Sequence, residues 1–126
     1  ELDVAFLQGD MCQPEALPGP FQLIVSNPPY IPRADAAEVQ ARVRKSEPEQ
    51  ALFVPDAKPL KFYSCLLDAG RRWLSPGGAL YVETHHSLAG EVASHLRQAG
   101  YEDIRVKKDI FGKERYVSGS LRGGLA

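Results

Sequence analysis

The chain is short of the residues and runs that mark metal, membrane and nucleic-acid proteins. It has two cysteines and three histidines in 126 residues, and its apolar runs fall far short of the roughly 20 residues that span a membrane. No secretory signal opens it, and a net charge of −1 provides no broad basic footprint for nucleic acid. These absences favour a cytoplasmic protein that contacts no membrane, and they disfavour a nucleic-acid partner.

The cysteines and histidines that are present form no obvious group. Cys12 and Cys65 stand far apart, and isolated cysteines are typical of free thiols in a reducing compartment, which we predict for both. His85 and His86 are neighbours, and neighbouring side chains on an extended chain point to opposite sides. The sequence therefore predicts no metal site.

Glycine-rich ligand loops are missing as well. No Gly-rich stretch precedes residue 27, and Gly112-Lys113 lacks the rest of any phosphate-binding loop. The chain opens on Glu1, without an initiator Met, and enters a strand-like run almost at once. We therefore expect it to be a piece of a longer protein.

Strand-like and helix-like segments alternate along the chain. The expected strands are Val4–Gln8, Phe21–Val25, Ala79–Thr84, Ile104–Lys108 and Arg115–Ser120, and the expected helices run from Pro59 to Leu74 and from Leu88 to Ala99. Strands separated by helices predict an α/β domain with a mostly parallel sheet. The last two strands should be antiparallel because their link is so short.

Glycine and proline should set the ends of the two helices. Ser75-Pro76-Gly77-Gly78 is expected to stop the first helix, and Gly100 should be the C′ residue of the second. Residues 31–55 are polar and interrupted by proline, which is typical of a binding loop, and a short helix is expected there over Asp35–Lys45.

The most informative stretch is the turn Ser26-Asn27-Pro28-Pro29-Tyr30. It follows the apolar run Phe21–Val25, which predicts a buried strand, and two consecutive prolines force the chain out of the sheet. Ligands of α/β sheets bind beyond the carboxyl ends of the strands. The turn and the segment Glu83–His85 should both lie at such ends.

This turn suits a planar group that carries an NH2. The side-chain oxygen of Asn27 and the carbonyl of Pro28 can accept its two N–H groups, and the ring of Tyr30 can stack on it. Holding both hydrogens out of the plane localises the nitrogen lone pair. Catalysis would then rest on orientation and electrostatics, without a strong base.

Several stretches resemble one family in the same order along the chain. They are Gln8-Gly9-Asp10, "SNPPYIP" at 26–32, "EPEQALF" at 47–53, "PLKFY" at 59–63, "LSPGGALYVE" at 74–83, "AGYEDI" at 99–104 and "KDIFGKERYV" at 108–117. The turn resembles that of S-adenosylmethionine-dependent methyltransferases acting on planar amino groups. The whole series resembles the release factor glutamine methyltransferases of the HemK/PrmC type.

The resemblance implies a truncated class I S-adenosylmethionine-dependent methyltransferase fold, which is α/β and Rossmann-like. Its sheet would be mostly parallel with an antiparallel C-terminal strand, and its first two strands and Gly-rich loop would be missing. Residues 1–126 would form the C-terminal part of a single methyltransferase domain, with 31–55 as the substrate-side loop.

The resemblance also implies a substrate site. Asn27, Pro28, Pro29 and Tyr30 would hold the glutamine of the Gly-Gly-Gln motif of peptide chain release factors, and Glu47 would lie beside it. Asn27, Pro28 and Tyr30 would be the catalytic residues. The reaction implied is N5-methylation of that glutamine.

For the cofactor, S-adenosylmethionine, the resemblance implies contacts from Asp10 and Met11, with Asn27 alongside. Without a Gly-rich loop, we expect the chain alone to bind the cofactor weakly and to be inactive. Its exposed strand edges would favour self-association.

Two other functions remain open at the level of sequence. An adenine-N6 methyltransferase for DNA or RNA shares the turn but should carry a basic target-binding region. A non-catalytic methyltransferase-like binding module would also lack the cofactor loop. The local basic cluster of Lys107, Lys108, Lys113 and Arg115 is expected to be a solvated face, with contact to a protein partner as the less favoured alternative.

Overall fold

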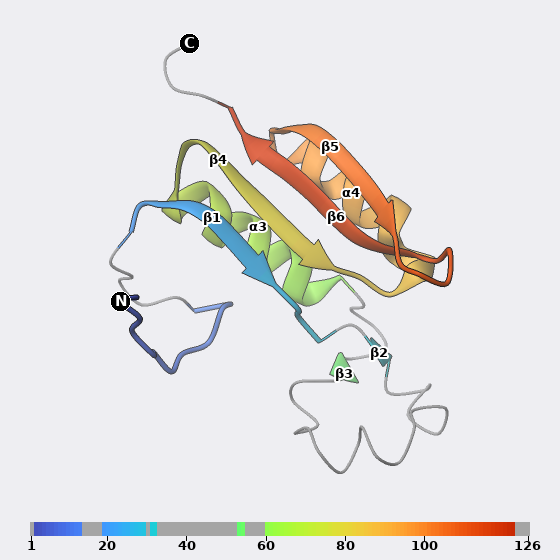
Figure 1. Ribbon diagram of the computed structural model, residues 1–126, viewed down its shortest axis with the longest axis horizontal. Helices are drawn as coiled ribbons and strands as arrows, with labels where there is room; N and C mark the ends of the chain where they lie inside the picture. Colours follow the sequence, from blue (N-terminus) through green and yellow to red (C-terminus); the bar gives the residue numbers. More distant parts are fainter. Residues whose placement is uncertain (1, 14–18, 30, 33–52, 55–59, 123–126) are drawn as a thin grey trace.

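The computed structural model contains one four-stranded sheet with two helices packed on one of its faces (Figure 1). It describes residues 2–13, 19–29, 31–32, 53–54 and 60–122. Across the sheet the order of the strands is β1 (Phe21–Ser26), β4 (Leu74–Glu83), β6 (Glu114–Leu121) and β5 (Tyr101–Lys108). The two helices are α3 (Lys61–Trp73) and α4 (Ala89–Gln98). A 3₁₀ turn, η2 (His86–Leu88), precedes α4. A two-residue pairing joins β2 (Ile31–Pro32) to β3 (Phe53–Val54).

Three of the four strands run in the same direction. β1 is parallel to β4, while β6 is antiparallel to both of its neighbours, β4 and β5. The α/β class, the common direction of most strands and the reversed C-terminal strand are therefore confirmed. Because Ser26 pairs with Val82, the carboxyl ends of β1 and β4 lie together at one edge of the sheet.

The core lies between the helices and one face of the sheet. Side chains alternate along a strand, so Leu80 and Val82 of β4 point into the core while Tyr81 between them is exposed. The remaining large core side chains are Tyr63, Leu66, Leu67, Leu74, Val92, Leu96, Tyr101 and Val117. The three- and four-residue spacing of these side chains within α3 and α4 is what the sequence predicted for amphipathic helices.

Both helices end where the glycine and proline signals predicted, but the residues after α3 differ from expectation. Gly100 follows α4 with a φ of 93°, the left-handed conformation expected of a C′ glycine. The α3 helix ends at Trp73, just before the predicted stop, but residues 75–78 belong to β4 and do not form a separate turn.

The β4 strand begins early because Leu74 pairs with Phe21 of β1. The register then shifts, and pairing resumes where Ala79 meets Leu23. The hydroxyl of Ser75 donates to the carbonyl of Phe21 at 3.1 Å.

Two strand predictions need correction. Val4–Gln8 is exposed and forms no strand, because within the part of the chain that the structure describes no strand lies beside it to complete a ladder. The β1 strand exists but is not buried. Within the described residues it is an edge strand, and Val25 is 71% exposed.

The prediction of free thiols is wrong. Cys12 and Cys65 form a disulfide with their Cα atoms 4.8 Å apart, linking the N-terminal segment to α3 across 53 positions of sequence. Contacts between residues so distant in sequence depend on the fold, which is why their spacing gave no sign of the bond. None of the described helices is long and apolar enough to cross a bilayer. The predicted helix at 35–45 lies outside the described residues.

Candidate functional site

The Asn-Pro-Pro turn begins where β1 ends. Pro28 is fully buried and Pro29 is buried, whereas Asn27 is exposed. The two prolines thus anchor the turn in the protein and leave the amide of Asn27 at the surface, where it can meet a ligand. Tyr30 and Glu47, also predicted to contact the substrate, lie outside the described residues.

The end of β4 lies beside this turn. Ser26 is the partner of Val82, so Asn27 and Glu83 follow at the same edge of the sheet. The phenol of Tyr63, from α3, donates to the carbonyl of Glu83 at 3.0 Å and holds the helix to the strand end. The expected meeting of two strand ends is confirmed.

Thr84, the last residue of the predicted strand Ala79–Thr84, is a residue of this edge that was not predicted to belong to the site. It is fully buried, and its hydroxyl has no hydrogen-bond partner among the described residues, while its N–H donates to the carbonyl of Arg115 at 2.7 Å. The sequence could have predicted the burial of Thr84, because it follows Leu80 and Val82 at a spacing of two residues and so continues the core-facing side of β4.

The neighbouring histidines behave differently from expectation. The rings of His85 and His86 stack with their centroids 4.5 Å apart, because the chain bends into η2 instead of staying extended. Nδ1 of His85 accepts from the N–H of Ser87 at 3.2 Å. The described residues contain no group of three or more His, Cys, Asp or Glu side chains placed to hold a metal ion.

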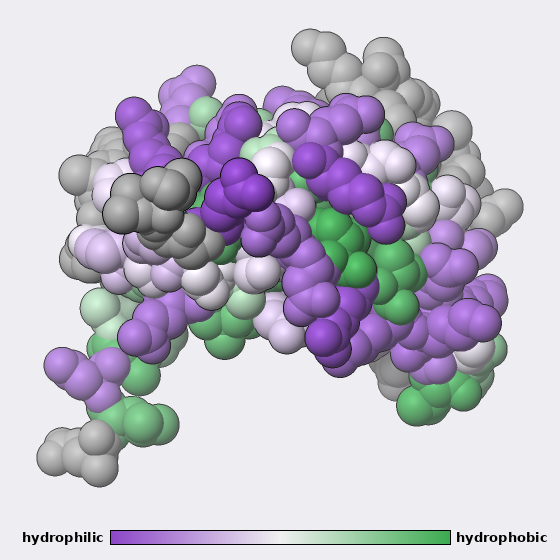
Figure 2. Space-filling model, turned by 90° about the horizontal axis from the view of Figure 1, so that it is seen from above, coloured by the Kyte–Doolittle hydropathy of each residue, from purple (hydrophilic) through white to green (hydrophobic). Residues whose placement is uncertain are grey.

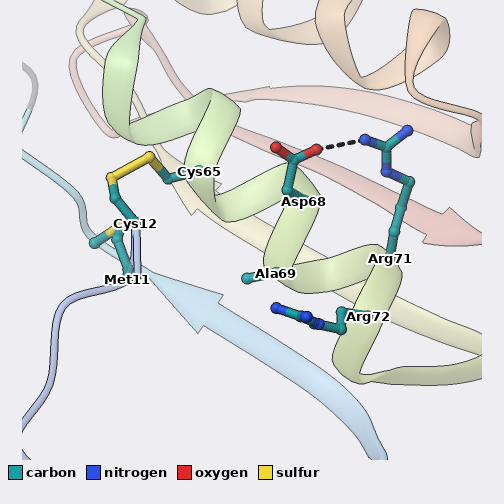
Figure 3. Close-up of a pocket in the computed structure, with 7 residues that line it drawn as sticks. All are labelled: Met11, Cys12, Cys65, Asp68, Ala69, Arg71 and Arg72. Atoms are coloured by element: carbon teal, nitrogen blue, oxygen red, sulfur yellow. Dashed lines mark hydrogen bonds and ion pairs between the residues drawn. A yellow bond between two sulfur atoms is a disulfide. The ribbon is translucent and has the colours of Figure 1, made fainter. Parts of the chain in front are cut away.

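A pocket of about 470 Å³ opens between the N-terminal segment and α3 (Figure 3). Its described lining residues are Met11, Cys12, Cys65, Asp68, Ala69, Arg71 and Arg72. Asp68 forms an ion pair with Arg71 along one wall, and the disulfide closes another. The lining of the pocket therefore combines apolar and charged side chains.

The structure brings only part of the predicted cofactor set to this pocket. Met11 lines it, whereas Asn27 is not among its described lining residues. The carboxylate of Asp10 instead accepts from the N–H of Cys12 at 2.9 Å, and the Asp10 carbonyl accepts from the N–H of Gln13. Asp10 therefore shapes the turn that carries Met11.

No protein-family model matches the chain, but several curated proteins do. A release factor glutamine methyltransferase of Bacteroides thetaiotaomicron is 41% identical over 121 residues, covering 94% of this chain and 44% of that protein. One from Deinococcus radiodurans is 40% identical over 123 residues, covering 98% and 42%. The chain matches the C-terminal part of the release factor glutamine methyltransferases.

A solved structure of the same kind agrees. The crystal structure of a release factor-specific protein-(glutamine-N5) methyltransferase from Alicyclobacillus acidocaldarius matches with a TM-score of 0.50 and 26% identity, over 82% of this chain and 50% of that one. The resemblance to release factor glutamine methyltransferases is thus confirmed. The chain spans less than half the length of the curated relatives it matches.

Proposed function

We propose that the protein containing this chain methylates the N5 nitrogen of the glutamine in the Gly-Gly-Gln motif of release factors, in the cytoplasm and with S-adenosylmethionine as donor. The observation that carries the proposal is the Asn27-Pro28-Pro29 turn. It leaves β1 at the carboxyl edge of the sheet, where α/β enzymes bind their ligands, with its prolines buried and its asparagine exposed. The names of the relatives support the same activity.

The chemistry follows from the acceptors that the turn offers. The side-chain oxygen of Asn27 and the carbonyl of Pro28 accept the two N–H groups of the glutamine amide and localise its lone pair on nitrogen. The amide nitrogen of the glutamine would take the methyl group, and the proton that it loses would pass to water. The residues of the turn would hold the amide in place during this exchange. S-adenosylmethionine supplies the electrophilic methyl group when bound.

The described residues fit one end of this cofactor. The lining of the pocket includes the apolar side chains of Met11 and Ala69, which suit a flat heterocycle such as adenine, and the guanidinium of Arg72 lies beside Ala69 and points toward Met11 (Figure 3). The described residues include no Gly-rich loop that could hold the amino-acid end. We infer that the rest of the cofactor site is formed by residues outside the segment that this chain shares with its relatives.

The test is a methyl-transfer assay with the full-length protein. We expect transfer from labelled S-adenosylmethionine to a release factor and to a short peptide containing its Gly-Gly-Gln sequence, and none to an adenine-containing oligonucleotide. Replacing Asn27 by Ala should lower kcat by about 10²- to 10³-fold, since it removes an aligned polar partner of the reacting group. Ser94→Ala, on the exposed side of α4, is the control. Methylation of the oligonucleotide instead of the peptide would overturn the proposal.

A further inference from the structure

We propose that the turn between β5 and β6 is a docking surface for the protein substrate, with the side chains of Ile110 and Phe111 as its apolar contact. This inference rests on the proposed function and adds a second contact, away from the reacting glutamine. We call residues 109–113 the hairpin tip.

The hairpin tip holds a defined conformation. The carboxylate of Asp109 accepts from the N–H of Phe111 at 2.8 Å and from the N–H of Lys113 at 3.0 Å, and it pairs with Nε of Arg115 at 3.2 Å. The N–H of Asp109 donates to the carbonyl of Lys113, and the carbonyl of Asp109 accepts from the N–H of Gly112. The φ of 79° at Gly112 closes the turn. The hydrogen bonds that the carboxylate accepts, of which that from the N–H of Lys113 has the largest effect, hold the pKa of Asp109 below its usual value. The carboxylate is therefore ionised at neutral pH and keeps these bonds.

On this fixed turn stand two large apolar side chains in solvent. Ile110 is 93% exposed and Phe111 is 81% exposed. In Figure 2 a hydrophobic patch lies at the right-hand end of the molecule, the end at which Figure 1 draws this turn. A rigid apolar contact loses little entropy on binding, and aromatic side chains are enriched in protein interfaces.

Lysines surround the apolar pair. Lys107, Lys108 and Lys113 are exposed, and the described ion pairs include none of them, whereas Arg115 is engaged with Asp109. Glu114 is also exposed and is the cross-strand partner of Lys108. With three lysines against this one glutamate, the surface has an apolar centre and a rim that is positive on balance. It fits a protein partner with an apolar spot bordered by acidic side chains.

The hairpin tip lies beyond the same edge of the sheet as the Asn-Pro-Pro turn. Tyr116, near the start of β6, pairs with Glu83 at the end of β4, and Ser26 pairs with Val82 one position earlier. Strands in a sheet are about 4.8 Å apart, so β6 and β5 lie roughly 10–15 Å from β1 across the sheet. A typical interface covers about 800 Å² on each partner, which is roughly 30 Å across. A folded substrate that reaches Asn27 would therefore cover the hairpin tip, and a short peptide would not.

The experiment compares two substrates of the full-length protein: an intact release factor and a short Gly-Gly-Gln peptide. In the double variant Ile110→Ser/Phe111→Ser we expect KM for the intact factor to rise about tenfold or more, with kcat unchanged and with the peptide unaffected. The matched control, Ile110→Leu/Phe111→Leu, keeps apolar side chains and should retain most of the affinity. Thermal melting checks that both variants are folded.

A second variant leaves the apolar pair intact. Lys113→Glu reverses one charge of the rim and should raise KM for the intact factor, with the difference shrinking at high salt. An unchanged KM for the intact factor in both Ser and Glu variants, or an equal loss with factor and peptide, would overturn the docking role. Wild-type protein that methylates neither substrate would instead reject the proposed function itself, and the docking role with it.

Discussion

At the scale of single residues, Gly70 shows how closely α3 approaches the rest of the core. A Cβ placed on Gly70 would overlap the phenol oxygen of Tyr101, which donates to the Leu67 carbonyl at 3.0 Å. We expect Gly70→Ala to destabilise the chain by roughly 1–3 kcal/mol, because overpacking displaces Tyr101 and strands a buried acceptor. Chemical denaturation measures the change.

The control is another helical glycine, Gly90 in α4. A Cβ there meets nothing within 4 Å, so Gly90→Ala should be neutral or stabilise by up to about 1 kcal/mol through helix propensity. Equal effects of the two substitutions would contradict the described packing of Tyr101 against α3.

Tyr101 also gives the chain a pH dependence. Burial raises the pKa of its phenol from 10.0 to about 12 in the folded state. Between pH 10 and pH 12 the phenol of Tyr101 is ionised in the unfolded chain but still protonated in the folded chain. The contribution of Tyr101 to the free energy of unfolding is therefore complete below pH 10 and is lost as the pH rises toward 12. We expect the gap in unfolding free energy between wild type and Tyr101→Phe to narrow over that range. A gap that stays constant up to pH 12 would show that the phenol is not shielded.

At the scale of elements, the disulfide ties the segment around Met11 to α3. Bond formation restricts the unfolded chain, and a loop of this length stabilises by about 2–4 kcal/mol in typical cases. We expect reductant to lower the melting temperature of the wild type and to leave the double variant Cys12→Ser/Cys65→Ser unchanged. Titration of two free thiols in the unreduced, denatured protein would rule out the bond.

At the scale of the whole molecule, the sequence has the Asn-Pro-Pro turn but no Gly-rich loop before it, and β1, an edge strand among the described residues, exposes Leu23 and Val25. We expect the 126-residue chain to bind S-adenosylmethionine very weakly and to associate through this edge, because unpaired strand edges favour pairing between chains. Calorimetry and light scattering are the measurements. A dissociation constant in the low micromolar range would contradict the first expectation, and a monodisperse monomer at high concentration the second.

Short-range features of this molecule followed from the sequence alone. Two prolines after an apolar run end β1 at Ser26, one residue beyond the predicted end at Val25, since proline cannot continue the strand ladder. The periodicity of α3 and α4 and the C′ position of Gly100 were predictable for the same reason, because each depends on a few neighbouring residues. The order of matching segments was enough to indicate the family.

Contacts between distant segments were decided only by the tertiary structure. The Cys12–Cys65 bond, the exposure of Val25 and the unpaired state of Val4–Gln8 each depend on which segment lies alongside which. The position of Asn27 beside Glu83 could be expected from the direction of the strands. The hydrogen bonds by which the Asp109 carboxylate stabilises the hairpin tip could not. A sequence determines local conformation through its neighbours, whereas burial and pairing depend on the free energy of the whole packed chain.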